Sequence, residues 1–264
     1  MAEILVPRPA ATVVTLRERE NGYEILMLKR NVLSDFVGGA YVFPGGAVDE
    51  EDAGDLAQSL CVGMNDESCS AALSLPSGGL AYYVACLREL FEEGGLLIAC
   101  DADGQTVDIS NRVLVDRLND ERVSVNDGSL GFLEMLAREK LFLDLRNVAY
   151  LAHWITPIGP PRRYDTRFFV TVAPPGQHAD HDNQETVASR WLRPSDALAM
   201  RERGELDMLF PTVRTLQSVA SFENAQAVVD HAKALTSIER TEPRVVERDG
   251  RVEILLPGDD GYAN

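Results

Sequence analysis

The chain has 264 residues, of which 45% are hydrophobic, so it is long and apolar enough to form a full globular core. A formal net charge of −17 opposes a nucleic-acid partner, because proteins that bind this polyanion normally present a basic face. No apolar run approaches the roughly 18 residues that span a bilayer, and residues 1–7 lack the features of a secretory signal. We therefore expect a soluble, cytoplasmic protein with no membrane partner and with reduced cysteines.

The N-terminal part is expected to form strands that lead to a glycine turn. Residues 11–16 and 24–29 are apolar, strand-like runs, and the Asn21-Gly22 pair between them is a hairpin signal. A further short strand at residues 41–43 ends at Gly45-Gly46. A glycine pair lets the backbone approach a ligand closely and frees a carbonyl to face a metal ion.

Residues 53–80 form a turn-rich insertion between this glycine turn and the next helix. Residues 66–68 and 76–79 are interpreted as turns, with at most a short helix at residues 55–60. Three roles are open for the insertion: a lid over a substrate, a contact between subunits, or a surface loop without a function of its own.

The helix that begins near Leu80 and ends at Gly94-Gly95 carries the acidic residues of interest. At 100° per residue, Glu89, Glu92 and Glu93 share one narrow face, opposite an apolar face. Like charges at this spacing destabilise a helix by roughly 0.2–0.5 kcal/mol per pair. The acidic face is therefore either a solvated surface or one wall of a cation site, and the glycine turn upstream favours a site for Mg²⁺ or Mn²⁺.

Together, the glycine turn and this helix resemble the Nudix box, in which a glycine and an acid are followed by a spacer and by Arg-Glu-apolar-x-Glu-Glu-x-Gly-apolar. Residues 88–96 match that second half at each fixed position. Asp52 replaces the usual glutamate, and the spacer before Arg88 is unusually long. Such a split box is similar to the Nudix branch that includes the peroxisomal coenzyme A diphosphatases. The resemblance implies an α/β fold, a three-layer α/β/α Nudix sandwich with a mixed sheet, a helical insertion and a C-terminal helical extension.

The rest of the chain predicts further elements around this motif. Apolar periodicity indicates helices at residues 111–121, 129–140, 195–203, 212–221 and 224–234, and strands at residues 149–155 and 186–192. Residues 209–212 are assigned to the core in preference to a substrate pocket. We expect residues 1–240 to form the Nudix domain, with the split box at 45–96 and the insertion at about 53–80. Residues 241–264 are expected to pack on it as a hairpin and tail.

Residues 162–170 are the most basic stretch of this acidic chain. Arg162, Arg163 and Arg167 suit bidentate contacts with phosphate, and ordinary ion pairs with surface acids are the alternative. The sequence from Trp154 onward also resembles the long-insertion Nudix branch, which favours the phosphate contacts.

The resemblance also implies roles for individual residues. The implied metal ligands are the Gly45 carbonyl and the carboxylates of Glu89, Glu92, Glu93 and Glu185. Arg88 would hold Glu89 by an ion pair, and Glu89 or Glu185 would serve as the base. Asp52 is an outer candidate.

The implied reaction is metal-dependent hydrolysis of the phosphoanhydride in a nucleoside diphosphate linked to another moiety. Residues 26–30 and Gly39 resemble the coenzyme A diphosphatase pattern, with Arg30 as a substrate contact, whereas Leu28 and Asp35 depart from it. Coenzyme A or acyl-coenzyme A is the first expectation, and nucleotide sugars and dinucleotides remain open. The alternative is a catalytically silent Nudix-fold module that binds or senses a nucleotide. A homodimer is expected from the resemblance alone.

Overall fold

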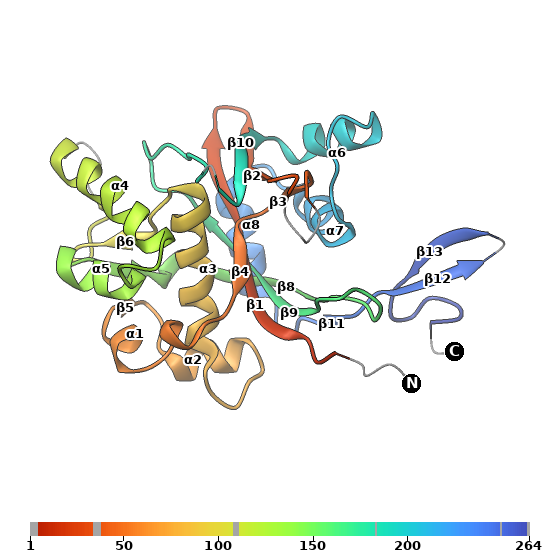
Figure 1. Cartoon of the computed structure of the whole chain (residues 1–264), viewed down its shortest axis with the longest axis horizontal. Helices are drawn as coiled ribbons and strands as arrows, with labels where there is room; N and C mark the ends of the chain where they lie inside the picture. The colour runs from red at the N-terminus through yellow and green to blue at the C-terminus, as the bar shows by residue number, and fades with distance from the viewer. Residues whose placement is uncertain (1–4, 34–37, 108–110, 183, 249, 263–264) are drawn as a thin grey trace.

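The computed structural model describes residues 5–33, 38–107, 111–182, 184–248 and 250–262. Its centre is a mixed sheet in the order β10-β2-β1-β9-β8-β11, with β3 paired to β2 and β4 paired to β1 (Figure 1). These strands are β1 (Arg8–Arg19), β2 (Gly22–Arg30), β3 (Tyr41–Val42), β4 (Gly45–Ala47), β8 (Ala149–Ile155), β9 (Tyr164–Val172), β10 (Thr186–Leu192) and β11 (Arg240–Thr241). Strand β1 is parallel to β9 and antiparallel to β2, so the predicted hairpin and mixed sheet are confirmed.

Helices cover both faces of this sheet. One face carries α1 (Asp55–Ser59), α2 (Asp66–Ala72), α3 (Gly79–Gly94), α4 (Arg112–Asn126) and α5 (Phe132–Glu139). The other carries α6 (Pro194–Glu202), α7 (Phe210–Val219) and α8 (Ala225–Ala234). Successive strand residues point to opposite faces, so Val13 packs in the first core and Val14 in the second. The predicted three-layer α/β/α arrangement is confirmed, with α3 lying directly against the sheet (Figure 1).

The insertion is more ordered than the sequence analysis predicted. Helix α1 confirms the predicted short helix, but residues 66–68 are the first turn of α2 and not a turn-rich loop. The Asn65 side chain accepts a hydrogen bond from the Ser68 N–H at 2.9 Å, and the Ser68 hydroxyl accepts one from the Asn65 N–H at 3.0 Å. This reciprocal cap nucleates α2.

The insertion is also attached to the rest of the fold. Strand β5 (Cys61–Val62) pairs with β7 (Phe142–Asp144), which also pairs with β6 (Ala99–Cys100). The Asp66 carboxylate accepts hydrogen bonds from the N–H groups of Gly78 and Leu80, both at 3.0 Å. Asp66 therefore caps the N-terminus of α3, where the backbone N–H groups lack helical partners, and these two hydrogen bonds lower its pKa.

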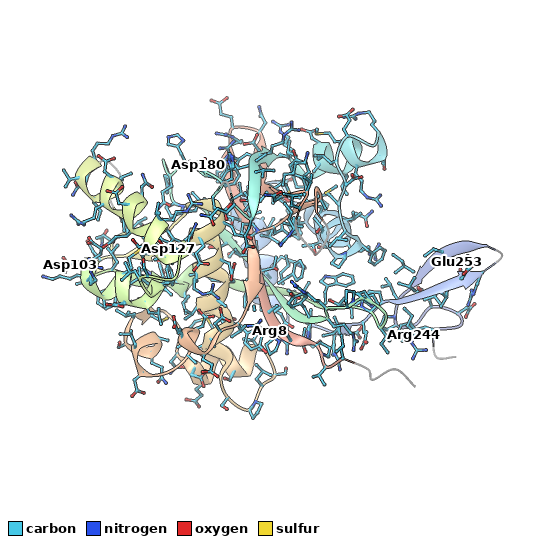
Figure 2. The ribbon with its side chains drawn as sticks, in the orientation of Figure 1. Arg8, Asp103, Asp127, Asp180, Arg244 and Glu253 are labelled. Carbon is cyan, nitrogen blue, oxygen red and sulfur yellow. The ribbon has the colours of Figure 1, made fainter. Side chains whose placement is uncertain are left out.

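The predicted C-terminal hairpin is confirmed as β12 (Arg244–Arg248) and β13 (Arg251–Leu255), which pair with each other. The hairpin extends away from the main body of the fold (Figure 1), with Arg244 near its base and Glu253 farther along it (Figure 2). After the hairpin, Leu256 packs against the core on the α6–α8 face, and the Tyr262 hydroxyl donates a hydrogen bond to the Glu242 carbonyl at 2.7 Å.

Two smaller expectations can be compared with the structure. All four cysteines are free thiols, and burial raises the pKa of Cys61 to about 12, so this thiol stays protonated. Within the described ranges, each helix is too short or too polar to cross a bilayer. Asp35, one of the departures from the coenzyme A pattern, lies outside the described residues.

Candidate active site

Two glycines bring the backbone of β4 close to its neighbours. Gly45 is paired with Thr12 of β1, and a Cβ atom at Gly45 would overlap the Thr12 side chain. A Cβ atom at Gly46 would overlap the carboxylate of Glu89 on α3. The glycine pair therefore allows an acidic side chain of the helix to lie directly against the strand, a close approach that only glycine permits.

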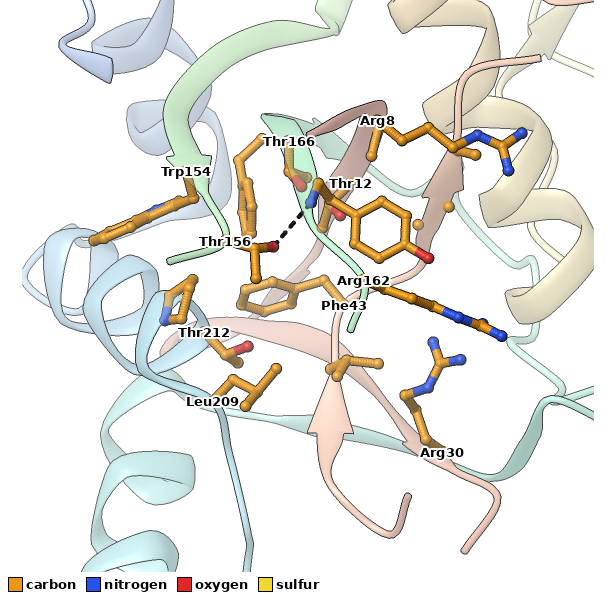
Figure 3. A pocket seen from close by; sticks show the side chains of 18 of the residues that line it. Arg8, Thr12, Arg30, Phe43, Trp154, Thr156, Arg162, Thr166, Leu209 and Thr212 are labelled. Atoms are coloured by element: carbon orange, nitrogen blue, oxygen red, sulfur yellow. Dashed lines mark hydrogen bonds between the residues drawn. The ribbon is translucent and has the colours of Figure 1, made fainter. Parts of the chain in front are cut away.

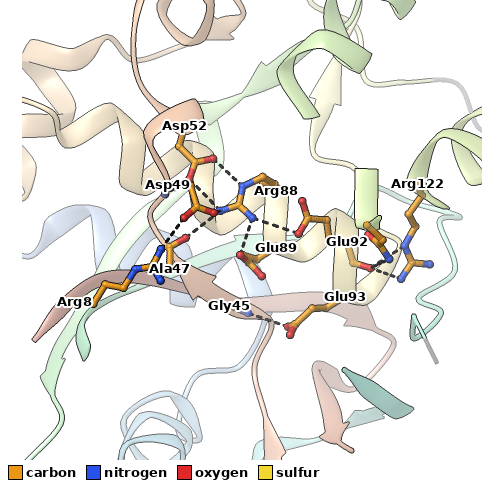
Figure 4. Close-up of polar contacts among 11 residues, drawn as sticks. Arg8, Gly45, Ala47, Asp49, Asp52, Arg88, Glu89, Glu92, Glu93 and Arg122 are labelled. Carbon is orange, nitrogen blue, oxygen red and sulfur yellow. Dashed lines mark hydrogen bonds and ion pairs between the residues drawn. The ribbon is translucent and has the colours of Figure 1, made fainter. Parts of the chain in front are cut away.

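The backbone of Gly45 faces the acidic helix. Val13 donates its N–H to the Pro44 carbonyl at 2.9 Å. Because hydrogen-bonded and non-hydrogen-bonded pairs alternate along antiparallel strands, the neighbouring pair of Thr12 and Gly45 is of the non-hydrogen-bonded kind. The backbone N–H and carbonyl groups of these two residues therefore point away from each other. The Gly45 N–H donates instead to Glu93 Oε2 at 3.1 Å (Figure 4). Because the N–H and the carbonyl of such a strand residue point to the same side, the Gly45 carbonyl is also directed away from β1.

Gly45 and Gly46 belong to strand β4 and not to the predicted turn. Arg88 organises the carboxylates beside them (Figure 4). Its guanidinium donates to both Asp52 oxygens at 2.8 and 3.0 Å, to Glu89 Oε1 at 2.7 Å and to Glu92 Oε2 at 3.3 Å. The ion pair expected between Arg88 and Glu89 is thus present. Asp52 is only 1% exposed, so its carboxylate binds Arg88 and does not reach the surface of the site. Through this bidentate contact, the aspartate at this position holds Arg88 in place.

The acidic face is buried enough to perturb its own ionisation. Burial raises the pKa of Glu92 to about 7, against the opposing charge of Arg88. Burial likewise raises the pKa of Glu89, and it raises that of Glu93 well above the usual value, with the Glu89 charge adding to the effect. Carboxylates that share a buried site resist ionising together. The face is therefore unlike a solvated helix surface.

The sequence analysis missed the residues that hold the C-terminal end of α3. Arg122 of α4 donates two hydrogen bonds to the Glu92 carbonyl, at 3.0 and 2.7 Å, and a third to the Asp180 carbonyl at 2.9 Å. Asn126 donates to the same Glu92 carbonyl at 3.3 Å. These contacts satisfy a helix-end carbonyl that has no helical partner. No local signal could have found them, because Arg122 lies on a different helix.

The carboxylates of Glu89 and Glu92 open into a cavity of about 1070 Å³, whereas Glu93, which is 3% exposed, is not among the residues that line it. Glu89, Glu92 and the glycine pair of β4 form one part of its lining, and Glu185 is 3.9 Å from Arg30 at the same cavity. Other lining residues are Arg8, Thr12, Phe43, Trp154, Arg162, Phe168, Leu209, Phe210, Pro211 and Thr212. Figure 3 shows Arg30 and Arg162 on one side and Trp154 on the other. Residues 209–212 all line the cavity, and Phe210 also packs against the core on the α6–α8 face, which corrects their assignment to the core alone.

The four arginines expected to bind substrate fall into two groups. Arg30 and Arg162 line the cavity, whereas Arg163 and Arg167 do not. Arg163 donates to the carbonyls of Thr156 and Leu5 at 3.0 and 2.7 Å and forms an ion pair with Glu242. Arg167 forms an ion pair with Asp165 and lies over the Tyr82 ring. The phosphate-contact interpretation fits the first group, and the ion-pair alternative fits the second.

The donor atoms at the site suit a hard divalent cation. Carboxylates and a backbone carbonyl are oxygen ligands, which Mg²⁺ and Mn²⁺ prefer. Among the described residues, no three acidic, histidine or cysteine side chains are gathered into a complete metal cage. This arrangement still fits Mg²⁺, which keeps several waters and takes only a few carboxylates together with substrate oxygens.

Comparisons with known proteins identify the family. A model of the NUDT19 Nudix domain matches residues 60–218. The acyl-coenzyme A diphosphatase NUDT19 of Xenopus laevis is 24% identical over 97% of this chain and 75% of its own length. That of Gallus gallus is 27% identical over 91% of this chain and 73% of its own length. The crystal structure of a NUDIX hydrolase from Alicyclobacillus acidocaldarius has a TM-score of 0.65 and 28% identity, covering 85% of this chain and 96% of that chain. The chain therefore belongs to the NUDT19 Nudix domain family and is a Nudix pyrophosphohydrolase.

Proposed function

We propose that this enzyme hydrolyses the diphosphate of coenzyme A or of an acyl-coenzyme A. The observation that carries the proposal is the cavity itself, whose lining combines acidic side chains, four arginines and an apolar wall. A nucleoside diphosphate joined to a pantetheine arm has a part for each of these surfaces. Among the candidate substrates, nucleotide sugars and dinucleotides included, only an acyl-coenzyme A carries a long aliphatic chain that could pack along the wall lined by Trp154, Phe168 and Phe210. The printed names of the similar proteins support the same substrate class.

The proposed metal ligands are the Gly45 carbonyl and the carboxylates of Glu89, Glu92, Glu93 and Glu185, which would hold Mg²⁺ or Mn²⁺. When bound, the cation would neutralise charge on the phosphoryl oxygens and make a water molecule more acidic. Arg88 would fix the orientation of Glu89 through their 2.7 Å ion pair. Arg30 and Arg162 would hold the diphosphate in line for attack, because guanidinium groups match phosphate oxygens in pairs.

Two carboxylates are the proposed bases that would accept a proton from the attacking water. Glu89 is held between Arg88 and the Gly46 backbone, whereas Glu185 is exposed over 67% of its side chain. Attack of water on one phosphorus breaks the bridging P–O bond and releases two phosphomonoesters, with the proton passing to the base. Either Glu89 or Glu185 is proposed as the base.

An activity panel tests the proposed substrate and the metal together. Coenzyme A, acyl-coenzyme A, NADH, ADP-ribose, diadenosine polyphosphates and a nucleotide sugar are each incubated with Mg²⁺, Mn²⁺ or EDTA. We expect coenzyme A compounds to be cleaved with the highest kcat/KM, and EDTA to abolish cleavage. Preferred cleavage of another class would remove the coenzyme A assignment. Binding by calorimetry without any turnover would support the silent sensing module.

The adjacent Arg162 and Arg163 provide a matched pair of variants. Replacing Arg162 with alanine should raise KM by roughly tenfold or more, since a charge-assisted hydrogen bond is worth about 1.5–3 kcal/mol. Replacing Arg163 with alanine should leave KM near the wild-type value and lower the thermal midpoint, because this side chain joins Leu5, Thr156 and Glu242. Steady-state kinetics and thermal unfolding measure both effects. The opposite pattern would exchange the two assignments.

Three further expectations stand as proposals. Residues 1–240 are proposed to form the catalytic domain, with residues 241–264 appended to it. The cytoplasmic location and the homodimer stay predictions, which fractionation and sedimentation velocity can test.

A further inference from the structure

The apolar wall of the cavity continues onto the C-terminal hairpin. Pro243, Val245 and Ile254 line the same cavity as Glu89 and the glycine pair of β4. Val245 and Ile254 are directly opposite each other in the β12–β13 register. Residues paired in this way project from the same face of a two-stranded sheet. One face of the hairpin is therefore turned toward the cavity.

That face carries three exposed apolar side chains and one exposed charged residue, Glu247. Val252, paired with Glu247, lies on the same face as Val245 and Ile254. The exposed fractions of these residues are 53% for Val245, 73% for Val252 and 41% for Ile254. We call these three residues the hairpin face. Adjacent exposed hydrophobic side chains of this kind mark interaction sites in soluble proteins.

The opposite face of the hairpin has a different character. It carries Arg244, Val246, Arg248, Glu253 and Leu255, and an ion pair of 3.7 Å joins Arg248 to Glu253. The charged residues suit a solvated surface, and Leu255 is already covered, at 8% exposed. The strongly exposed apolar side chains of the hairpin, Val245, Val252 and Ile254, therefore lie on the face turned toward the cavity.

We propose that the hairpin face binds the acyl chain of the substrate, as a subsite continuous with the catalytic cavity. This inference rests on the proposed function. The charged residues of the cavity are Arg30, Arg162 and those of the acidic helix, whereas its apolar residues continue to the hairpin. This separation would orient an amphiphilic substrate in the cavity. An acyl chain that extends past the pantetheine arm would cover Val245 and Ile254. The occupant is substrate and not a second copy of the chain, because these side chains line the cavity itself.

The dependence of hydrolysis on acyl-chain length tests this subsite. The measured quantity is the ratio of kcat/KM for octanoyl-coenzyme A to that for acetyl-coenzyme A, which cancels any general loss of active enzyme. Each methylene group buried on the hairpin face should raise kcat/KM by up to about fourfold, equivalent to about 0.8 kcal/mol. For the wild-type enzyme we expect a ratio well above one. The double variant Val245→Ser/Ile254→Ser should lower that ratio roughly tenfold.

The matched control is Val246→Ser, a change of the same kind on the opposite face of the hairpin. It should leave the ratio at the wild-type value. An unchanged ratio in the double variant, or an equal fall in the control, would overturn the proposal. A change from dimer to monomer in the double variant, seen by sedimentation velocity, would assign the face to a second copy instead. Equal cleavage of all chain lengths overturns the subsite alone, whereas cleavage of other diphosphates but no coenzyme A compound overturns the proposed function as well.

Discussion

Replacing Glu93 with glutamine is expected to lower kcat by roughly 10²- to 10³-fold, the scale seen when one group that stabilises developing charge is removed. Glu93 is 3% exposed and accepts the Gly45 N–H at 3.1 Å. A glutamine oxygen can still accept that hydrogen bond, so the fold should persist while the negative charge is lost. The variant Glu92→Gln should behave in the same way. Single-turnover kinetics would measure the loss of rate, and calorimetry with Mn²⁺ would measure the weakened metal binding.

Glu121 provides the control for this change. It is a glutamate only 8% exposed on α4, and it is paired with Arg138 of α5. The variant Glu121→Gln also neutralises a buried carboxyl group, but we expect kcat to stay within about twofold of wild type, because the change lies outside the site. If Glu92→Gln and Glu93→Gln both retained near wild-type turnover, these two residues would lose their assignment as metal ligands.

Replacing Arg88 with methionine should both inactivate the enzyme and destabilise it. The Arg88 side chain is 12% exposed and that of Asp52 is 2% exposed, so the variant leaves a buried carboxylate without its cation. Removing one partner of a buried ion pair costs about 3–5 kcal/mol. Burial lowers the pKa of Arg88, but the hydrogen bond to Asp52 and the charge of Glu89 outweigh it and raise the pKa. Urea unfolding would measure the loss of stability.

A second variant separates pairing from packing. The double variant Arg88→Met/Asp52→Leu removes both partners, and replacing both can be nearly neutral in free energy. It should therefore be more stable than Arg88→Met alone and remain inactive, since Glu89 still lacks its anchor. Additive destabilisation in the double variant would contradict the buried pair. The variant Arg117→Met, which breaks the exposed contact with Glu139, should leave the unfolding midpoint close to wild type.

Much of the fold could be predicted because local sequence patterns determine it. Strands β8 and β10 have the predicted bounds, and α3 ends at the predicted glycine pair, where Gly95 adopts a positive φ of 66°. Helix α2 was missed because its cap depends on Asn65 and Ser68, two residues that are also common in turns. The acidic helix and the predicted glycine turn could be assigned to one site from the sequence only because together they form a recognisable motif.

The site depends on contacts that no local pattern encodes. Which of two adjacent arginines reaches the cavity depends on the orientation of each residue at the start of β9, and that requires the tertiary structure. The apolar wall combines residues from β3, β8, β9, α7 and the hairpin, which lie far apart in the sequence. The cap on α3 by Arg122 is likewise formed between two helices. The sequence thus predicted the acidic side of the site but not the surface opposite it.

The insertion changes what holds the catalytic motif together. Asp52 and Arg88 are 36 positions apart and still form a bidentate contact, and each doubling of a loop costs only about 0.6 kcal/mol of closure entropy. Asp66 attaches the insertion to α3, and β5 attaches it to β7. Both attachments come before the exposed residues Pro76 and Ser77 in the sequence. The two halves of the motif are therefore aligned by noncovalent contacts and not by chain connectivity. A backbone break between Pro76 and Ser77 would divide the motif into two polypeptides that remain assembled.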